Sequence, residues 1–209
     1  MYIGIAGNIG SGKSAMAKLL ADEFGFNTFD EKGEENPYLA DFYADMPRWA
    51  LNLQVSFLIK RFKSTQRAMW SDEVVVQDRT IYEDVYVFVE NLRAMHIMTE
   101  RDYNTYRSLF DVMESFLAQP RLLIYLRASV PMLMTHIQQR GVAYESAISR
   151  DYLTMLNNRY ESWFESYRSD SLLIDIDNTD FVGNKADRDK VIDAIASQLQ
   201  LPSPKKHSD

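Results

Sequence analysis

Residues 7–14 carry the pattern G-x-x-x-x-G-K-S/T, directly after an apolar run and at the start of an amphipathic stretch. Glycines in such a loop adopt positive φ angles and turn backbone N–H groups toward an anion, to which the following helix N-terminus adds positive potential. Lys13 would add a charge between the phosphates of a nucleotide, and the Ser14 hydroxyl is placed to coordinate Mg²⁺. The pattern therefore predicts a nucleotide-phosphate loop made of Gly7, Asn8, Ile9, Gly10, Ser11, Gly12, Lys13 and Ser14.

Charged residues also gather where two later apolar runs end. Asp30 and Glu31 follow one run, Asp78 and Arg79 close the next, and Asp84 lies about one helical turn into the segment after it. Such density of charge is suggestive of a site. In the ordinary alternative, Asp84 offsets its helix dipole and Asp78 and Arg79 form a surface pair. Glu31 has the same double interpretation, because other acids lie close by.

A third set of polar residues lies on the helix expected at residues 48–70. Gln54, Phe57, Leu58 and Arg61 follow the i, i+3, i+4, i+7 spacing of one helix face. An amide and a guanidinium beside apolar side chains suit a pocket wall, where a planar ligand lies on Phe57 and Gln54 pairs with its polar edge. The alternative is a solvated face, with Gln54 and Arg61 in water and Phe57 pointing elsewhere.

Five short apolar segments are separated by longer segments of helical periodicity. They lie at residues 2–6, 26–30, 74–78, 122–127 and 172–176. This alternation predicts an α/β fold, with a five-stranded parallel sheet flanked by helices on both faces. Ligands of such sheets bind beyond the carboxyl ends of the strands. We therefore expect the residue 7–14 loop, Asp30-Glu31 and Asp78-Arg79 to lie at one edge.

Composition limits the classes of function. The chain has 209 residues, 46% of them hydrophobic, and we interpret residues 1–209 as one domain with a flexible tail at 202–209. A net charge of −7 disfavours broad binding to nucleic acid. A first strand at residue 2 leaves no room for a signal peptide, no apolar run is long enough for a membrane span, and cysteine is absent. We expect a cytoplasmic protein with a small-molecule ligand and no nucleic-acid or membrane partner.

An ordered series of short motifs extends over nearly the whole chain. Besides the residue 7–14 loop, it comprises Glu31, Asn36-Pro37-Tyr38-Leu39, Phe42-Tyr43, Leu53-Gln54 with Arg61-Phe62, residues 78–84, Arg140-Gly141, Tyr144-Glu145 and Asp180-Phe181. The series resembles the deoxyribonucleoside kinase family, especially its bacterial deoxyadenosine and deoxyguanosine kinase branch. The resemblance implies a P-loop kinase fold of the nucleoside kinase type. It also implies transfer of the γ-phosphate of ATP to a deoxynucleoside 5′-hydroxyl in nucleotide salvage.

The resemblance implies roles around the reacting phosphate. Glu31 is the base that accepts the proton of the 5′-hydroxyl, and Arg79 holds that carboxylate and the acceptor oxygen. Asp78 assists Mg²⁺ through water, Arg140 is a lid arginine that closes on the donor phosphates, and Phe181 lies in the loop that holds the donor adenine.

These roles agree with the physics of phosphoryl transfer. The reaction spreads negative charge over the equatorial oxygens, so a catalyst mainly supplies cations, aligned N–H groups and an in-line acceptor. Lys13, Arg79, Arg140 and Mg²⁺ would supply the positive charge.

The resemblance also implies how the acceptor is recognised. Tyr43 and Glu145 are the partners of the sugar 3′-hydroxyl, whereas Gln54, Arg61 and Asp84 read the base. In the family, Arg and Asp at the last two positions accompany purines or amine-bearing bases, and thymidine-accepting members carry smaller or apolar residues. A carboxylate accepts from an exocyclic amine. We expect deoxyadenosine as the main substrate, with deoxyguanosine and deoxycytidine secondary.

The chain departs from the family pattern at three positions. Many members have a second lid arginine where this chain has Val142, and a serine where it has Thr80. Eukaryotic members have proline where it has Lys32. None of these departures removes an essential group, and the missing lid cation makes Arg140 the residue to test.

Two other classes of protein share parts of the pattern. Asn184-Lys185-Ala186-Asp187 matches the N-K-x-D motif of GTPases, and residues 30–33 match D-x-x-G, but the latter lie too close to the phosphate loop for a switch segment. Asp187 is more simply the N-terminal cap of the last helix. A nucleoside monophosphate kinase would need extra cations for the acceptor phosphate, whereas Tyr43, Asp84 and Glu145 are neutral or acidic.

The family commonly forms dimers through long helices. Residues 47–70 and 80–98 have the length and apolar content for such contacts. We therefore expect a homodimer.

Overall fold

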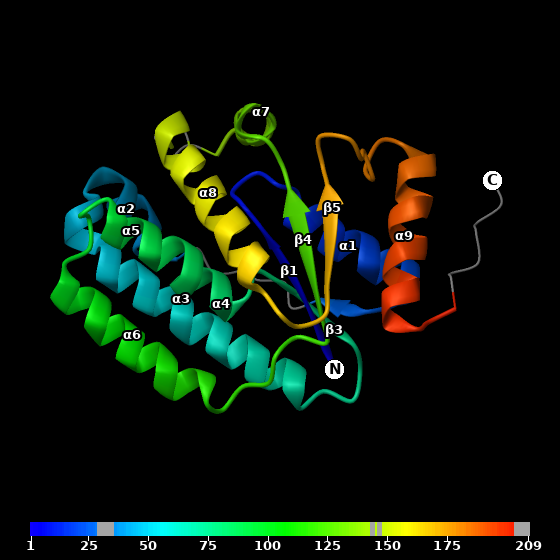
Figure 1. The fold of residues 1–209 in the computed structure, drawn as a ribbon, viewed down its shortest axis with the longest axis horizontal. Helices are drawn as coiled ribbons and strands as arrows, with labels where there is room; N and C mark the ends of the chain where they lie inside the picture. The colour runs from blue at the N-terminus through cyan, green and yellow to red at the C-terminus, as the bar shows by residue number, and fades with distance from the viewer. Residues whose placement is uncertain (29–35, 143–144, 146–147, 203–209) are drawn as a thin grey trace.

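The computed structural model describes residues 1–28, 36–142, 145 and 148–202. At its centre is a parallel sheet of five strands in the order β2-β3-β1-β4-β5 (Figure 1). The strands are β1 (Tyr2–Gly7), β2 (Asn27–Thr28), β3 (Val75–Asp78), β4 (Leu122–Arg127) and β5 (Ser171–Asp175). The predicted α/β fold with a five-stranded parallel sheet is confirmed.

Helices cover both faces of the sheet. On one face lie α1 (Lys13–Phe24) and α9 (Lys185–Leu199), as Figure 1 shows. On the other lie α2 (Leu39–Ala44), α3 (Met46–Met69), α4 (Ile81–Glu83), η1 (Asp84–Val89), α5 (Glu90–Ala94), α6 (Glu100–Glu114) and α8 (Arg150–Ser166). Helix α7 (Val130–Arg140) follows β4 at the carboxyl edge of the sheet.

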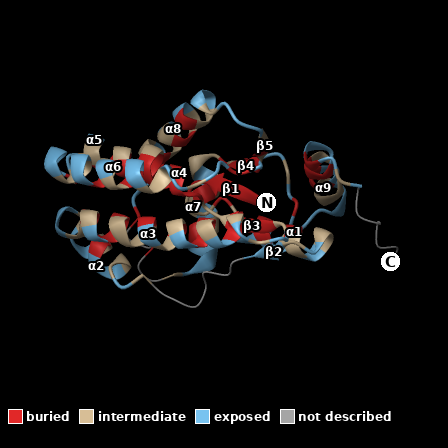
Figure 2. Cartoon of the chain, turned by 90° about the horizontal axis from the view of Figure 1, so that it is seen from below, coloured by how far each residue is buried: buried red, intermediate tan, exposed pale blue. Residues whose placement is uncertain are grey.

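Alternation along β4 shows how the sheet divides the core. Leu122, Ile124 and Leu126 pack with α1 and α9, whereas Leu123 and Tyr125 face the helices on the other side. This follows from the period of two along a strand, and both sides are apolar because both faces are covered. Buried residues accordingly concentrate along the strands and the inward sides of the helices (Figure 2).

The boundaries of several predicted elements differ from the structure. The edge strand β2 has two described residues where five were predicted, and residues 29–30 lie outside the described residues. Strand β5 starts and ends one residue before the predicted range of 172–176. Helix α3 starts two residues before the predicted position because Asp45 caps it, accepting from the backbone N–H of Arg48 at 3.3 Å. Residues 203–209 of the predicted tail are not among those described.

The long helix expected within residues 80–98 is present but shorter and irregular, running without a break from Ile81 to Ala94. The segment begins as α4, widens into the π-helix η1, and ends as α5 at Ala94, after which His96 adopts a left-handed φ of 56°. π-Helical turns are rare and occur frequently at functional sites. This one carries Asp84, one of the predicted site residues.

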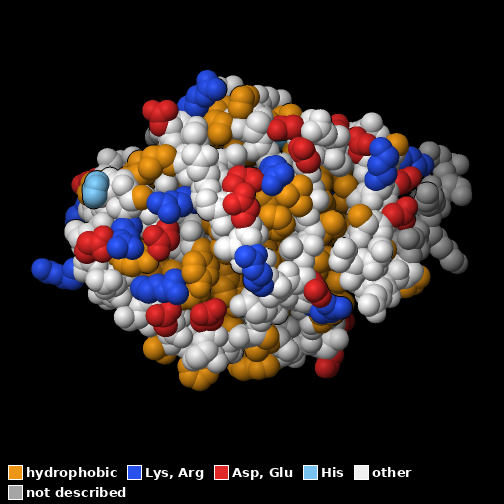
Figure 3. Space-filling model, in the orientation of Figure 1, with side chains coloured by type: hydrophobic (Ala, Val, Ile, Leu, Met, Phe, Trp, Pro, Cys, Tyr) orange, Lys and Arg blue, Asp and Glu red, His pale blue; other side chains and the backbone are white. Residues whose placement is uncertain are grey.

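The distribution of charged side chains on the surface bears on nucleic-acid binding, which the net charge of −7 disfavours. On the face shown in Figure 3, Lys and Arg side chains are interspersed with Asp and Glu and do not gather into one basic area. None of the helices within the described ranges combines the length and apolar character needed to cross a membrane.

Candidate active site

The loop at residues 7–14 connects β1 to α1 at the carboxyl edge of the sheet. Gly10 and Gly12 have φ angles of 86° and 90°, in the left-handed region that favours glycine. Gly10 also has no room for a side chain, because a Cβ would lie 2.9 Å from the carbonyl oxygen of Leu133 in α7. Backbone conformation and the close approach of α7 therefore explain these two glycines of the motif.

Lys13 is buried at the start of α1, and its ammonium group turns back onto the loop. Its Nζ donates to the carbonyl oxygens of Gly7 and Asn8, both at 2.9 Å. Burial lowers the pKa of Lys13 to about 7, and the charge of Arg79 adds to the lowering. A bound phosphate would act in the opposite direction, so the charged ammonium and an anionic ligand stabilise each other.

Gly7 and Asn8 lie behind the cavity that the rest of the loop lines. The Asn8 side chain donates to the carbonyl oxygen of Leu153 and to Asn157, both at 3.1 Å, and so points toward α8. These two predicted site residues are therefore outside the lining of the cavity. They contribute the carbonyl oxygens that hold Lys13 instead.

Ser14, in the first turn of α1, lies beside Asp78, the last residue of β3. The Ser14 hydroxyl donates to Oδ2 of Asp78 at 2.6 Å, and both residues line the cavity. Hydroxyl and carboxylate oxygens are hard ligands that suit a divalent cation such as Mg²⁺, which usually keeps several waters and substrate phosphates as further ligands. The residues present therefore fit the predicted metal position.

Arg79 follows Asp78 in a strained backbone conformation. Its φ of 71° is unusual for a residue with a side chain, and its N–H donates to the carbonyl oxygen of Ile5 at 2.9 Å. The guanidinium carbon lies 4.4 Å from the centroid of the Phe88 ring. Burial favours loss of the proton, but Tyr160 and nearby carboxylates outweigh it and raise the pKa of Arg79, so the group stays charged.

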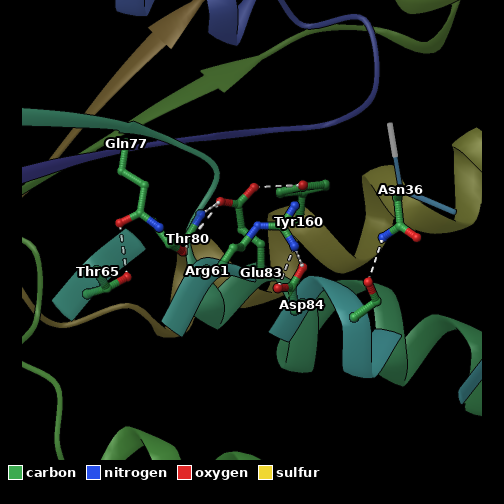
Figure 4. A network of polar contacts seen from close by, with 9 residues as sticks. Asn36, Arg61, Thr65, Gln77, Thr80, Glu83, Asp84 and Tyr160 are labelled. Carbon is green, nitrogen blue, oxygen red and sulfur yellow. Dashed lines mark hydrogen bonds and ion pairs between the residues drawn. The ribbon is translucent and has the colours of Figure 1, made fainter. Parts of the chain in front are cut away.

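A buried ion pair lies on the opposite wall, between α3 and η1. Nη1 of Arg61 donates to both carboxylate oxygens of Asp84, each at 2.6 Å (Figure 4). Burial raises the pKa of Asp84 to about 6, and the Arg61 charge opposes the rise. The alternative in which Asp84 only offsets the helix dipole does not account for its buried ion pair with Arg61.

Gln54 and Phe57 share this face of α3. Gln54 is 3% exposed, and the guanidinium carbon of Arg61 lies 4.8 Å from the Phe57 ring centroid. Both residues line the cavity with Arg61, whereas Leu58 is packed into the core. The solvated-face alternative is therefore wrong.

Arg140 and Glu145 were predicted to act on different ligands, yet they contact each other. The Arg140 Nε and Nη2 atoms donate to the two carboxylate oxygens of Glu145 at 2.9 and 2.5 Å. Arg140 ends α7 with about half of its side chain exposed, while Glu145 is largely buried. Tyr43 of α2 lines the same cavity.

Phe181 is buried beside the phosphate loop. A Cβ added to Gly12 would lie 3.6 Å from its ring, and its carbonyl oxygen accepts from Nε of Arg188 in α9 at 3.0 Å. Arg188 also contacts the carbonyl oxygen of Val182. Helix α9 thus fixes the backbone of this loop next to the phosphate site.

The cap of α9 differs from the prediction. Asn184, not Asp187, is the N-cap, and its Oδ1 accepts from the backbone N–H groups of Ala186 and Asp187 at 2.9 and 3.3 Å. Asp187 instead accepts from the N–H of Asp180 at 3.2 Å. The N-K-x-D match is therefore explained by local capping.

One cavity of about 1360 Å³ joins most of these groups. Its lining contains every predicted site residue from 9 to 181 that the structure describes; these are Ile9, Gly10, Ser11, Gly12, Lys13, Ser14, Tyr43, Gln54, Phe57, Arg61, Asp78, Arg79, Asp84, Arg140, Glu145 and Phe181. Glu31, the predicted base, lies outside the described residues. Residues far apart in the sequence thus converge on a single space large enough for two nucleotide-sized ligands.

Sequence reasoning gave no role to four residues of this region. Phe88, His136 and Tyr152 also line the cavity, and Nδ1 of His136 lies 2.8 Å from the carbonyl oxygen of Gly10. Glu83 lies behind the wall, fully buried. Only Glu83 had a usable signal, since Thr80-x-x-Glu83 has the spacing of a capping box.

Comparison with known proteins decides among the classes of P-loop protein. The family model described as deoxynucleoside kinase matches residues 3–200. The chain belongs to the deoxynucleoside kinase family. This kinase is 37% identical to the deoxyadenosine/deoxycytidine kinase of Bacillus subtilis over 94% of its own length and 92% of the relative's. It is 30% identical to the deoxyguanosine kinase of the same organism, over 91% and 93%.

A solved structure resembles this kinase over its whole fold. It is the deoxyadenosine kinase from M. mycoides with dCMP and a flexible dCDP bound, at a TM-score of 0.83 and 27% identity, covering 94% of this chain and 100% of the other. The predicted family, P-loop nucleoside kinase fold and ATP-dependent kinase activity are confirmed. The GTPase and monophosphate kinase alternatives are set aside.

Proposed function

We propose that this kinase transfers the γ-phosphate of ATP to the 5′-hydroxyl of a deoxynucleoside in nucleotide salvage. Deoxyadenosine is the preferred acceptor, and deoxyguanosine and deoxycytidine are secondary. The observation that carries the proposal is the lining of one cavity by the phosphate loop and by the buried Arg61–Asp84 pair. A phosphate donor and a base-bearing acceptor can therefore share one enclosed space.

In the proposed reaction, the 5′-oxygen attacks the γ-phosphorus while the bond to the β-phosphate oxygen breaks. Glu31 accepts the hydroxyl proton late, because a loose transition state does not require prior deprotonation. This role is supported by the motif resemblance. Lys13, Arg79 and Arg140 supply positive charge where it develops on the transferred group.

The metal belongs to the same proposal. Ser14 and, through water, Asp78 would hold Mg²⁺, and the 2.6 Å contact between them supports a shared position. When bound, the cation would neutralise charge on the donor phosphates. The loop around Phe181 would hold the donor adenine, close to Gly12.

Recognition of the base is supported by polar atoms without partners. Oε1 of Gln54 and Nε of Arg61 are buried and have no hydrogen-bond partner among the described residues. Oε1 can accept from the exocyclic amine of adenine while the Gln54 amide donates to a ring nitrogen. Asp84 offers a second acceptor. Thymine has no exocyclic amine to donate to these acceptors, so it leaves buried groups unpaired.

The relatives support the same preference. The Bacillus subtilis enzyme is named for deoxyadenosine and deoxycytidine, and structures of the M. mycoides deoxyadenosine kinase contain dCTP or dATP. Adenine and cytosine both carry an exocyclic amine. The sugar would lie between Tyr43 and Glu145, which pair with its 3′-hydroxyl and crowd a ribose 2′-hydroxyl.

The test is turnover of the four deoxynucleosides with ATP. We expect kcat/KM to be highest for deoxyadenosine, lower for deoxyguanosine and deoxycytidine, and lowest for thymidine. Faster phosphorylation of thymidine than of the other three would overturn the base assignment. Glu31→Gln should abolish turnover while retaining ATP binding. An unchanged rate would overturn the assignment of Glu31 as the general base.

We also propose that the kinase is a homodimer. The apolar content of residues 81–94 is no support for this, because Val85, Val87, Val89 and Leu92 are buried in the chain's own core. Support comes instead from Ile59 on α3, Val112 on α6 and Phe116 in the turn after α6, which are exposed on or next to two helices that pack together.

A further inference from the structure

Glu83, at the end of α4, is a carboxylate with 0% exposure that accepts hydrogen bonds from three separate segments. Oε1 accepts from the Gly7 N–H at 3.2 Å and from the Tyr160 hydroxyl at 2.8 Å. Oε2 accepts from the Thr80 N–H at 2.8 Å and, more weakly, from its hydroxyl at 3.4 Å. Figure 4 shows the carboxylate between Thr80 and Tyr160. The described contacts thus satisfy both oxygens.

Local helix capping accounts for only half of these bonds. The bonds to Thr80 complete a capping box, which is a local device at a helix start. The bonds to Gly7 and Tyr160 span 76 and 77 residues of sequence. Burial raises the pKa of Tyr160 well above its ordinary value, so its hydroxyl remains a donor. Glu83 therefore joins the sheet, the phosphate loop and α8.

The two backbone groups that Glu83 holds adjoin the cationic residues of the site. Gly7 begins the phosphate loop, and its carbonyl oxygen accepts from Lys13. Thr80 directly follows Arg79, whose φ of 71° persists only if its neighbours fix it. The Glu83 charge also acts on both Lys13 and Arg79 without forming an ion pair with either.

We propose that Glu83 is a positioning residue for phosphoryl transfer, which sets the distance between the Lys13 ammonium and the Arg79 guanidinium by holding Gly7 and Thr80 to one carboxylate. Two rigidly spaced cations match the charge that develops on the transferred phosphoryl group without reorganisation during the reaction. The inference rests on the proposed function.

The direct test is Glu83→Gln. The amide keeps the volume but presents an NH₂ group to one backbone N–H donor, because Gly7 and Thr80 occupy opposite oxygens. We expect kcat to fall about tenfold or more, with KM for deoxyadenosine within about threefold of wild type. Amide hydrogen exchange at Gly7 and Thr80 should also accelerate. An unchanged kcat, measured per mole of folded protein, overturns the proposal.

A hydroxyl deletion provides a milder variant with a matched control. Tyr160→Phe removes one donor to Glu83 and leaves every charge in place, whereas Tyr125→Phe removes the same 2.8 Å bond from Glu161, outside the cavity. The two rings stack on each other, so their surroundings are similar. We expect comparable losses of Tm, but a kcat reduced about threefold or more only in Tyr160→Phe. Equal kcat values in these two variants would contradict the proposal. This comparison stands on its own even if Glu83→Gln fails to fold.

A double-mutant cycle separates positioning from general stability. If Glu83 acts through Arg79, then Glu83→Gln should cost much less in kcat when Arg79→Lys is already present. Additive losses would overturn the proposal. Failure of the proposed function can be distinguished from failure of the Glu83 proposal. If the wild-type protein phosphorylates no deoxynucleoside, the proposed function is wrong. Accelerated amide exchange in Glu83→Gln would still report that Glu83 holds Gly7 and Thr80.

Discussion

In the proposed reaction, Arg140 would exchange its contact with Glu145 for the donor phosphates. In this structure the guanidinium makes two hydrogen bonds to that carboxylate, and about half of the arginine side chain faces solvent. A triphosphate carries more negative charge than one carboxylate, so exchange of partners is favoured when donor binds. Glu145 would then become available as an acceptor for the sugar 3′-hydroxyl, its proposed ligand. The contact thus links the two proposed ligand positions.

Arg140→Ala should lower kcat about tenfold or more, because it removes the lid cation from the transition state. KM for deoxyadenosine should stay unchanged or fall, since Glu145 no longer has to leave an ion pair. Arg127→Ala is the control: Arg127 has similar exposure and makes the same two-pronged contact with Glu161, outside the cavity. Steady-state kinetics at saturating ATP measure both, and a loss below about threefold for Arg140→Ala would count against a lid role.

Asp84 should give acceptor binding a dependence on pH. Because burial raises the pKa of Asp84 to about 6, the group is ionised at pH 7.5 and can accept from an amine, whereas protonation below pH 6 turns one oxygen into a donor. We expect KM for deoxyadenosine to rise below pH 6, by about tenfold per pH unit at most. The KM of Asp84→Asn should be higher at neutral pH and independent of pH over this range. A flat wild-type profile would contradict the assignment.

The same shift affects folding with the opposite sign. A carboxyl whose pKa is higher in the folded protein binds more protons there than in the unfolded chain. The contribution of Asp84 to the free energy of unfolding is therefore full below its ordinary pKa of 3.8 and is lost as the pH rises through about 6. Function thus requires Asp84 in the form that folding favours less.

Individual site residues were predictable where a motif fixed the backbone around them. The residue 7–14 loop, Asp78 and Arg79 follow strand ends, so their convergence follows from the parallel sheet. The contact between Arg140 and Glu145 could not be predicted, because it depends on where α7 ends relative to the next loop. Glu83 shows the same limit: its spacing indicates a cap, but its bond to Gly7 crosses 76 residues.

At the scale of elements, strand β1 and the turn after β3 fit against each other closely. A Cβ on Gly4 would lie 2.6 Å from the Thr80 methyl group, at the point where Thr80 supports Glu83. We expect Gly4→Ala to lower the free energy of unfolding by about 1–3 kcal/mol, as overpacking does in other cores. Adding Thr80→Ser, which removes that methyl, should restore part of the loss in thermal unfolding. If the double variant recovers no stability, the strain lies elsewhere, for instance at Leu123, whose Cδ1 would lie 3.3 Å from the added Cβ.

Elements with strong local signals were predicted well, and elements set by tertiary contacts were not. The range of β4 matches the prediction residue by residue, since an apolar run defines it. The π-helix η1 has no such signal. Within it, Asp84 and Phe88 line the cavity while Val85 and Val89 remain in the core. Helices α3, α6 and α8 all contact this segment, and such tertiary packing has no signal in the local sequence.

At the scale of the whole molecule, the apolar surface is uneven. The large buried core accounts for the sheet and its helices, but Ile59 on α3, Val112 on α6 and Phe116 in the turn after α6 are 40%, 61% and 65% exposed. Most isolated surface hydrophobics need no explanation, whereas several on two packed helices indicate a contact surface.

If α3 and α6 form the interface of a homodimer, a charge placed there should separate the subunits. Phe116→Glu would bury a carboxylate against apolar side chains of the partner subunit. The free energy needed to desolvate that charge is much larger than the binding free energy that one residue of an ordinary interface contributes. We expect light scattering to give twice the mass of one chain for the wild type and a single-chain mass for Phe116→Glu. Gln198→Glu adds the same charge at an exposed position of α9, on the other side of the sheet, and should stay dimeric. A monomeric wild type contradicts the homodimer, and a dimeric Phe116→Glu moves its interface away from α6.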